Sequence, residues 1–172
     1  MLNITMKKIN LLISTFFGYG YISFIPGTVT SFVTTVFIYI AYEILGYTEL
    51  KFSIIFFLLL FLYSFYAVKD SESEFKNKDP RQIVIDEVLG QSMPLMLVLY
   101  LSENNLITLK IEFYYIVSFF LFRFFDIFKP FPVNYFDKNF KNSFGVIMDD
   151  VCAGFYVVLS LICFMVLKSY FI

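Results

Sequence analysis

Long apolar segments almost without charged residues constrain this sequence more than any other feature. Four of them cover 29–45, 52–68, 88–101 and 151–167, and a fifth, 113–128, is interrupted only by Arg123 and Asp126. Their lengths lie near or somewhat below the roughly 17–25 residues that a membrane-spanning helix needs. Phe and Leu recur on every face of these segments, which indicates contact with lipid rather than an amphipathic helix on a soluble domain.

The overall composition supports the same class of protein. Only 16% of the 172 residues are charged and 59% are hydrophobic, whereas an ordinary soluble domain carries about 25% charged residues. A soluble domain of this length does not bury so much apolar surface behind so few charges. The net charge of -1 lacks the basic surplus expected of a nucleic-acid-binding protein. We predict one domain over residues 1–172, an all-α polytopic membrane bundle of about four or five transmembrane helices.

The absence of histidine narrows the chemistry that this chain can perform. It excludes a Ser-His-Asp triad, a Cys-His pair and a histidine nucleophile. Cys152 and Cys163 lie in one apolar run, roughly 16 Å apart along a helix, which is too far for a disulfide. Neither cysteine begins a phosphate-binding Cys-x5-Arg loop, and no zinc site follows from them. Any catalysis must therefore use carboxylates, Lys, Arg, hydroxyl groups or a metal ion.

The first 25 residues allow three interpretations. The uncharged stretch between Lys8 and Glu43 is longer than one span, and glycines and Pro26 interrupt it. Met1–Phe17 fits a signal peptide, although it lacks a typical cleavage site. The other interpretations are a separate span, or a short helix that lies on the membrane or dips into it.

The positive-inside rule favours the short helix. If residues 9–25 do not span, nine Lys and Arg residues lie inside and three outside, with the intrahelical Arg123 set aside. If they do span, five lie inside and seven outside. We therefore predict an N-terminal re-entrant or surface helix followed by five spans, with the N-terminus in the cytoplasm and the C-terminus outside. The segments 69–82 and 129–145 are then cytoplasmic connecting loops.

Seven ionisable residues fall at the predicted cytoplasmic boundary of three spans. Acidic pairs open the third and fifth spans, and two cations flank an aspartate at the inner end of the fourth. These residues are Asp86, Glu87, Arg123, Asp126, Lys129, Asp149 and Asp150. A charge at the bilayer centre costs about 2.5–3.5 kcal/mol, and less near the interface. So many charges on three helices favour one shared site.

Each part of this pattern also has a simpler interpretation. The first acidic pair suits the early turns of a helix, where the dipole favours negative charge; that helix is predicted to begin at Pro80, with Asp79 as its N-cap. The Arg–Asp spacing suits a structural salt bridge. The second acidic pair alone merely marks where a span begins. These interpretations weaken when the charges are considered together.

Carboxylate ligands without histidine suit Mg²⁺ or Mn²⁺, which bind substrate phosphate directly. Arg and Lys beside such a metal suit a phosphate ester, and the N-terminus of the fifth helix adds a further attraction for anions. The residues alone therefore predict a metal-dependent site for phosphate chemistry at the cytoplasmic side of the membrane.

Several motifs, in this order, resemble the phosphatidylglycerophosphatase A family. They are 83–90 (IVIDEVLG), 122–132 (FRFFDIFKPFP) and 145–154 (GVIMDDVCAG), preceded by Gly18-Tyr19-Gly20 and Pro26-Gly27-Thr28. The resemblance covers nearly the whole chain. It departs from the family where paired glycines before Gly145 are replaced by Asn142 and Ser143, and no charged motif position is lost.

The resemblance implies a Mg²⁺-dependent lipid phosphatase of the bacterial inner membrane. Such an enzyme hydrolyses phosphatidylglycerophosphate, a phospholipid in the membrane, to phosphatidylglycerol and phosphate, the last step of phosphatidylglycerol synthesis. Its catalytic carboxylates would be Asp86, Glu87, Asp126, Asp149 and Asp150. The metal ligands would come from Asp86, Glu87, Asp149 and Asp150, and the phosphate would be bound by Thr28, Arg123 and Lys129.

The expected mechanism is attack of a metal-activated water on phosphorus, with a neighbouring carboxylate as base. Which carboxylate is ligand and which is base stays open, as does a covalent aspartyl-phosphate route. A competing hypothesis is a small polytopic transporter with an ionisable ion or substrate path. It predicts charges near mid-bilayer and an inverted repeat, and the sequence has neither. A purely structural membrane subunit leaves the clustered charges unexplained.

Overall fold

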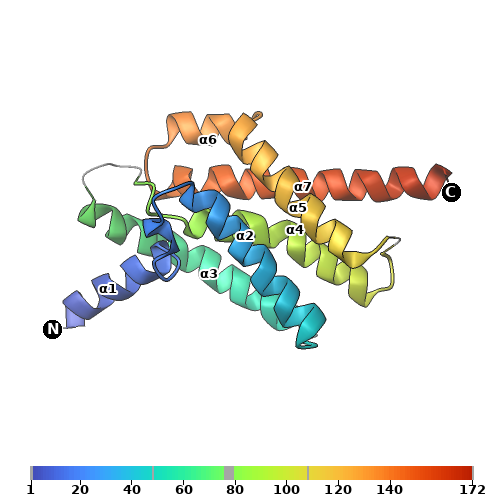
Figure 1. The fold of residues 1–172 in the computed structure, drawn as a ribbon. Helices are drawn as coiled ribbons and strands as arrows, with labels where there is room; N and C mark the ends of the chain where they lie inside the picture. The colour runs from blue at the N-terminus through green and yellow to red at the C-terminus, as the bar shows by residue number, and fades with distance from the viewer. Residues whose placement is uncertain (1, 48, 76–79, 108, 172) are drawn as a thin grey trace.

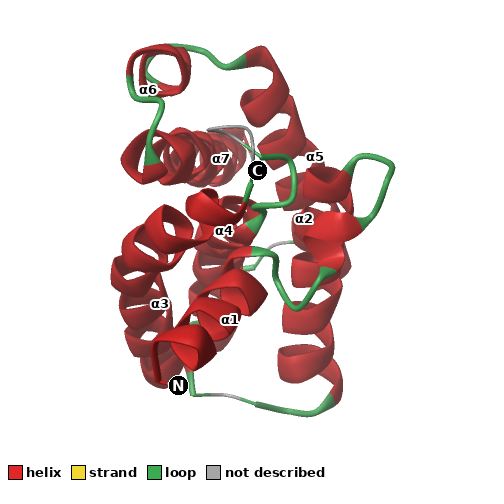
Figure 2. Cartoon of the chain, turned by 90° about the vertical axis from the view of Figure 1, so that its left-hand side faces the viewer, coloured by secondary structure: helices red, strands yellow, loops and turns green. Residues whose placement is uncertain are grey.

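The structure, a computed structural model, describes residues 2–47, 49–75, 80–107 and 109–171. These residues form helices and turns, with no strand among them (Figure 2). The long helices are α2 (Pro26–Tyr39, continued by the π-helix Ile40–Ile44), α3 (Leu50–Ser71), α4 (Ile85–Glu103), α5 (Ile111–Phe128) and α7 (Ser143–Phe171). The short ones are α1 (Leu2–Ser14), α6 (Val133–Asn139) and the 3₁₀ turns Tyr19–Tyr21 and Glu72–Glu74. The all-α prediction is confirmed for this part of the chain.

The five long helices form a bundle in which successive helices alternate in direction (Figure 1). The helices α2, α4 and α7 begin at the end of the bundle where α3 and α5 finish. The central helix is α4, which packs against α2, α3, α5 and α7. The connections therefore gather three helix starts and two helix ends at one end of the bundle.

Two apolar clusters hold the bundle together. One joins α4, α5 and α7 through buried side chains such as Leu95, Phe122 and Val157. The other joins α3, α4 and α7 near the shared end through Val68, Leu89 and Ile147. Close packing of these side chains holds the helices together through van der Waals contacts, and it leaves the outward faces of the helices free of core contacts.

Those outward faces are apolar. On α3, Phe56, Leu59 and Leu62 are 67%, 63% and 66% exposed. Three helical segments are long and apolar enough to cross a membrane: Pro26–Ile44, Leu50–Glu74 and Ser143–Lys168. So large an apolar exterior does not suit water, and the chain is a membrane protein.

The short helix α1 lies at one end of the bundle, beside the last turns of α3 (Figure 1). Its 13 residues make a helix of about 20 Å, shorter than a bilayer's hydrocarbon core. Asn10 attaches it to α3: its amide donates to Asp70 at 2.8 Å and accepts from the hydroxyl of Tyr63 at 2.6 Å. After α1 the chain turns at Gly18, whose φ of 93° lies in the region that glycine adopts freely.

Two predicted boundaries are wrong. The third predicted span does not begin at Pro80: α4 begins at Ile85, because the backbone N–H of Val84 donates to the carbonyl of Ser14 at 2.9 Å and keeps the preceding residues in a turn. The predicted N-cap Asp79 lies outside the described residues. The segment 129–145 is not only a loop, since it contains α6 and the start of α7, joined by aromatic contacts of Phe144 with residues of α6 and its end.

Candidate active site

The shared end of the bundle contains a polar cavity of about 440 Å³. It lies where α2, α4 and α7 begin and α5 ends, and α6 borders it. All of the site residues predicted from the sequence line this cavity: Thr28, Asp86, Glu87, Arg123, Asp126, Lys129, Asp149 and Asp150. The fold therefore brings the motifs of four helices to one place.

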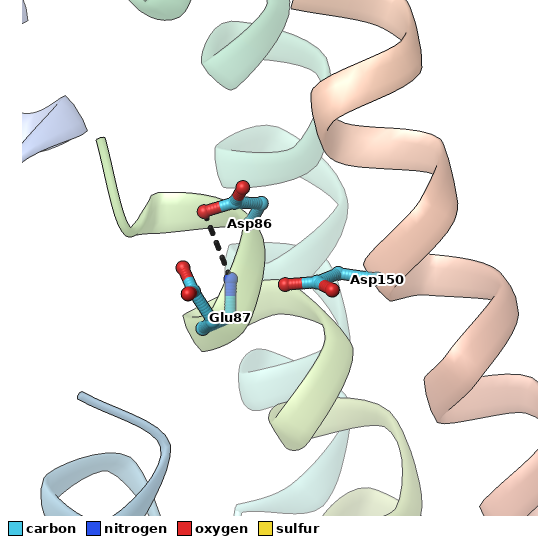
Figure 3. Close-up of side chains that lie close together, drawn as sticks. All are labelled: Asp86, Glu87 and Asp150. Carbon is cyan, nitrogen blue, oxygen red and sulfur yellow. Dashed lines mark hydrogen bonds between the residues drawn. The ribbon is translucent and has the colours of Figure 1, made fainter. Parts of the chain in front are cut away.

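Asp86, Glu87 and Asp150 form an acidic cluster within the cavity (Figure 3). One carboxylate oxygen from each residue lies within 4.8 Å of the other two, with Asp150 reaching from α7 toward α4. Asp86 accepts a hydrogen bond of 3.1 Å from the backbone N–H of Glu87. Asp150 is only 4% exposed. Carboxylates this close repel one another when ionised, so the cluster calls for a positive charge between them.

Two glycines bring α4 and α7 close enough for this cluster to form. A Cβ atom on Gly154 would lie 2.3 Å from the carbonyl oxygen of Gly90, and one on Gly90 would lie 2.6 Å from the carbonyl oxygen of Asp150. A larger residue at either position must therefore separate the helices. Each glycine follows an acidic residue, Asp86 or Asp150, by one helical turn, so their contact sets the spacing of the acidic pairs.

Gly27 has a similar relation to Glu87. A Cβ atom at Gly27 would lie 1.9 Å from Oε1 of Glu87. The helix α2 begins at Pro26, whose fixed φ suits a first helical turn. The missing side chain at the next position lets Glu87 lie against the start of α2, beside Thr28.

Two of the cations that line the cavity, Arg123 and Lys129, pair with carboxylates outside the acidic cluster. Nη1 of Arg123 lies 2.9 Å from Oδ2 of Asp126. Nζ of Lys129 lies 2.9 Å from an oxygen of Asp149 and 2.9 Å from one of Asp137. The Nε of Arg123 is buried and makes no hydrogen bond within the described chain, which leaves it available to an oxygen of a bound anion.

These contacts keep Lys129 charged. Burial acts to lower its pKa, but the charge of Asp149 and the hydrogen bonds to Asp137 and Asp149 outweigh burial and raise the pKa of Lys129. Burial likewise acts to raise the pKa of Asp137, and the hydrogen bond and charge of Lys129 outweigh it and lower that pKa. Lys129 also ends α5 in a left-handed conformation, with a φ of 45°, which costs an L-residue roughly 1–2 kcal/mol. The ion pairs hold it there.

The acidic cluster fits a hard divalent cation. Mg²⁺ prefers oxygen ligands at about 2.0–2.1 Å, which places those ligands roughly 2.9–4.2 Å from one another. The three carboxylates, within 4.8 Å of one another, reach that spacing after a small inward movement. Oε2 of Glu87 is buried and has no hydrogen-bond partner among the described residues. The ligand type and this unpartnered oxygen therefore both suit Mg²⁺ or Mn²⁺.

Asp149 stands apart from the cluster, although the sequence predicts it as a metal ligand. Its Oδ2 contacts Lys129, and its Oδ1 accepts a hydrogen bond of 3.0 Å from the backbone N–H of Asp150. Asp126 similarly contacts Arg123. The structure thus separates the predicted carboxylates into three that face one another and two that each contact a cation.

Two residues that help to position the site residues are not apparent from the sequence. Asp137 on α6 contacts Lys129, but it lies in a segment predicted as loop, where no periodic pattern marks it. Asn142 accepts a hydrogen bond of 3.1 Å from the backbone N–H of Gly145 and so caps the start of α7. This side chain stands where the resembled family has a glycine, and it offers a different way to begin the helix that carries Asp149 and Asp150.

The helical membrane fold and this cavity of carboxylates and cations are those of a membrane-embedded hydrolase of phosphate esters. The family model described as phosphatidylglycerophosphatase A matches residues 12–165. The chain belongs to the phosphatidylglycerophosphatase A family, which confirms the resemblance seen in its motifs.

Individual relatives support this assignment. The chain is 36% identical over 162 residues to a phosphatidylglycerophosphatase A of Haemophilus influenzae, covering 91% of this chain and 92% of the relative. It is 36% identical over 147 residues to a putative phosphatidylinositol-3-phosphatase of Bacteroides thetaiotaomicron, covering 85% and 87%. A phosphatidylglycerophosphatase A of Escherichia coli is 26% identical over 143 residues, covering 83% and 76%. No solved structure matches the chain.

Proposed function

We propose that this chain hydrolyses phosphatidylglycerophosphate to phosphatidylglycerol and inorganic phosphate, with Mg²⁺ as cofactor, in the last step of phosphatidylglycerol synthesis. The observation that carries the proposal is the acidic cluster of Asp86, Glu87 and Asp150, which shares its cavity with Arg123 and Lys129. A hard cation and two fixed cations are the groups that a doubly charged phosphate monoester requires.

The proposed location is the bacterial cytoplasmic membrane, with five spans and the cavity facing the cytoplasm. Five alternating long helices, a short α1 and the excess of Lys and Arg at the cavity end support this arrangement. Single cysteines at Asn139 and Asn104, both exposed, in a cysteine-free background test it. In intact cells an impermeant maleimide should label position 104 and spare position 139; labelling of 139 would reverse the orientation.

The residues of the chain have distinct proposed roles. Arg123 donates to phosphate oxygens while Asp126 holds its guanidinium in place. Lys129, held by Asp137 and Asp149, neutralises charge that develops on the equatorial oxygens. Thr28, at the start of α2, lines the same cavity and offers a hydroxyl donor. These groups orient the phosphorus for attack by water.

Asp86, Glu87 and Asp150 would hold the Mg²⁺. Bound there, the cation would supply Lewis-acid polarisation of the phosphate and lower the pKa of a bound water. A carboxylate that lines the cavity accepts the proton of the attacking water. The new O–P bond forms as the bond to the glycerol oxygen breaks, and that oxygen takes a proton to restore the hydroxyl group of phosphatidylglycerol.

Phosphate release from purified protein in detergent, with and without Mg²⁺, tests this function. Phosphatidylglycerophosphate should be hydrolysed only when Mg²⁺ is present. No release from it under any metal condition would refute the proposal.

A second substrate has a specific observation in its favour. A relative as similar in identity as the first carries the name putative phosphatidylinositol-3-phosphatase. Phosphatidylinositol 3-phosphate, assayed in parallel, should be hydrolysed with a lower kcat/KM than phosphatidylglycerophosphate; the reverse order would make it the preferred substrate.

A further inference from the structure

An apolar groove of about 330 Å³ lies on α7 next to the polar cavity. Its lining comes from α7, from α4 and from the turn before α6: Met93, Pro132, Val151, Cys152, Phe155, Tyr156 and Leu159. The hydroxyl of Tyr156 donates to the backbone carbonyl of Phe131 and so adds no free polar group. The α7 residues of the groove, 151–159, lie within Ser143–Lys168, a segment long and apolar enough to span a membrane.

The groove and the polar cavity adjoin along α7. Asp149, Cys152 and Tyr156 are spaced i, i+3 and i+7, so they lie on one face of the helix. Asp149 lines the cavity and Cys152 lines the groove. The lining therefore changes from charged to apolar within about one helical turn, roughly 5 Å.

The turn 129–132 also contributes residues to both the polar cavity and the groove. Lys129 lines the cavity, and Pro132 lines the groove. The hydrogen bond from Tyr156 to Phe131 and the stacking of Phe125 on Tyr156, with centroids 5.1 Å apart, attach this turn and the end of α5 to α7. A ligand that fills both pockets must be anionic at one end and hydrocarbon at the other.

We infer that the groove binds an acyl chain of the lipid substrate while the phosphate monoester lies at the acidic cluster. This inference rests on the proposed function and extends it to how the substrate is held. The volume of the groove is in the range of small-ligand sites, and its position lets the chain stay in the apolar phase while the head group reaches the cavity. The groove is then a specificity element for long-chain lipids.

The two native cysteines supply a matched pair of variants. Cys152→Phe fills the groove, whereas Cys163→Phe makes the same change on the same helix at an exposed position. Each is assayed with long-chain phosphatidylglycerophosphate and with its deacylated head group. The ratio of kcat/KM for the long-chain substrate to that for the head group should fall at least tenfold in Cys152→Phe and stay within twofold of wild type in Cys163→Phe. An unchanged ratio in Cys152→Phe would overturn the inference.

A binding measurement on the wild-type protein keeps the inference testable without activity or a folded variant. A phosphatidylglycerophosphate analogue with a photoactivatable group on one acyl chain should label Cys152, Phe155 or Leu159. Unlabelled phosphatidylglycerophosphate should suppress that labelling at least fivefold, and phosphatidylcholine should not, while labelling at the outward Phe56 of α3 responds to neither. Equal suppression by phosphatidylcholine would show that the groove is a surface for bulk lipid, and no label in the groove would overturn the inference. Groove labelling without phosphate release would refute the proposed function alone.

Discussion

The neighbouring helices α3 and α4 are similar in length but face different surroundings. In α3, five of the 22 residues are buried, and the segment Leu50–Glu74 that contains it is long and apolar enough to cross a membrane. In α4, eleven of the 19 residues are buried, among them Gln91 and Ser92. The more apolar helix is thus the more exposed one, which is the reverse of a soluble protein.

The difference shows that, in this molecule, an apolar helix sequence indicates exposure to lipid and not a place in the core. The exposed side chains of α3 between Phe52 and Tyr66 are aliphatic or aromatic, as contact with lipid requires. The helix α4 is enclosed by α2, α3, α5 and α7, and this enclosure lets it carry polar residues, including Asp86 and Glu87 in its first turn. The less apolar of the two helices therefore carries Asp86 and Glu87, because its neighbours shield it from lipid.

The largest effect is expected from removing a charge on α4. Glu87→Gln keeps the size of the side chain and removes the negative charge that a divalent cation requires. Turnover should fall by roughly 100- to 1,000-fold, the loss of several kcal/mol of transition-state stabilisation. The matched change Glu43→Gln, at an exposed position outside the cavity, should leave turnover within about twofold of wild type. Equal losses in both variants would contradict a special role for α4.

A charge placed on α3 tests its contact with lipid. Leu59, 63% exposed, lies in the middle of the span, where a lysine costs about 2.5–3.5 kcal/mol. Leu59→Lys should therefore reduce the ratio of inserted to uninserted protein by roughly 70- to 400-fold on that scale, measured after carbonate extraction. Leu106→Lys, in the turn between α4 and α5, should insert normally. Normal insertion of Leu59→Lys would mean that α3 does not face lipid.

Arg123 tests whether the cations of the cavity bind phosphate or only brace the helices. Arg123→Lys keeps the charge and loses the planar fork that contacts two phosphate oxygens. Loss of one hydrogen bond to a charged group, about 1.5–3 kcal/mol, should lower kcat/KM at least about tenfold while the thermal midpoint changes little. A variant that is fully active but less stable would identify a structural salt bridge.

The smallest effect is expected at the cysteines. Cys152 and Cys163 are both free thiols on a helix whose outer face meets lipid, and neither lines the polar cavity. The double change to serine should keep activity within about twofold of wild type and remove sensitivity to alkylating agents. A loss of activity toward both the long-chain substrate and its deacylated head group, at normal folded yield, would point to a thiol mechanism; a loss toward the long-chain substrate alone would reflect the groove that Cys152 lines.

Those features that depend on local pattern could be predicted from the sequence. The apolar segments predict the long helices, and charges at their boundaries predict that Asp86, Arg123 and Asp150 share one site, because a charge near lipid is stable only beside another charged or polar group. The structure places all three in one cavity. The motifs also led to the correct family.

Features that depend on contacts between distant segments could not be predicted in this way. The start of α4 depends on a hydrogen bond from Val84 to Ser14, and no local rule contains that contact. The position of Asp149 depends on Lys129 and, through it, on Asp137 of α6. Two adjacent aspartates look equivalent in the sequence, and only the packing of α5 and α6 against α7 gives them different partners.

The most direct test of the account is a Mg²⁺ titration of phosphate release per folded molecule. It compares wild type, Asp86→Asn, Asp150→Asn and the control Glu43→Gln, with phosphatidylglycerophosphate as substrate. If carboxylates from α4 and α7 hold the cation together, both Asp→Asn variants should need at least tenfold more Mg²⁺ for half-maximal release and reach a much lower maximum. The control should follow the wild-type curve. If all four proteins share one Mg²⁺ curve, the acidic cluster of Asp86, Glu87 and Asp150 is not the metal site.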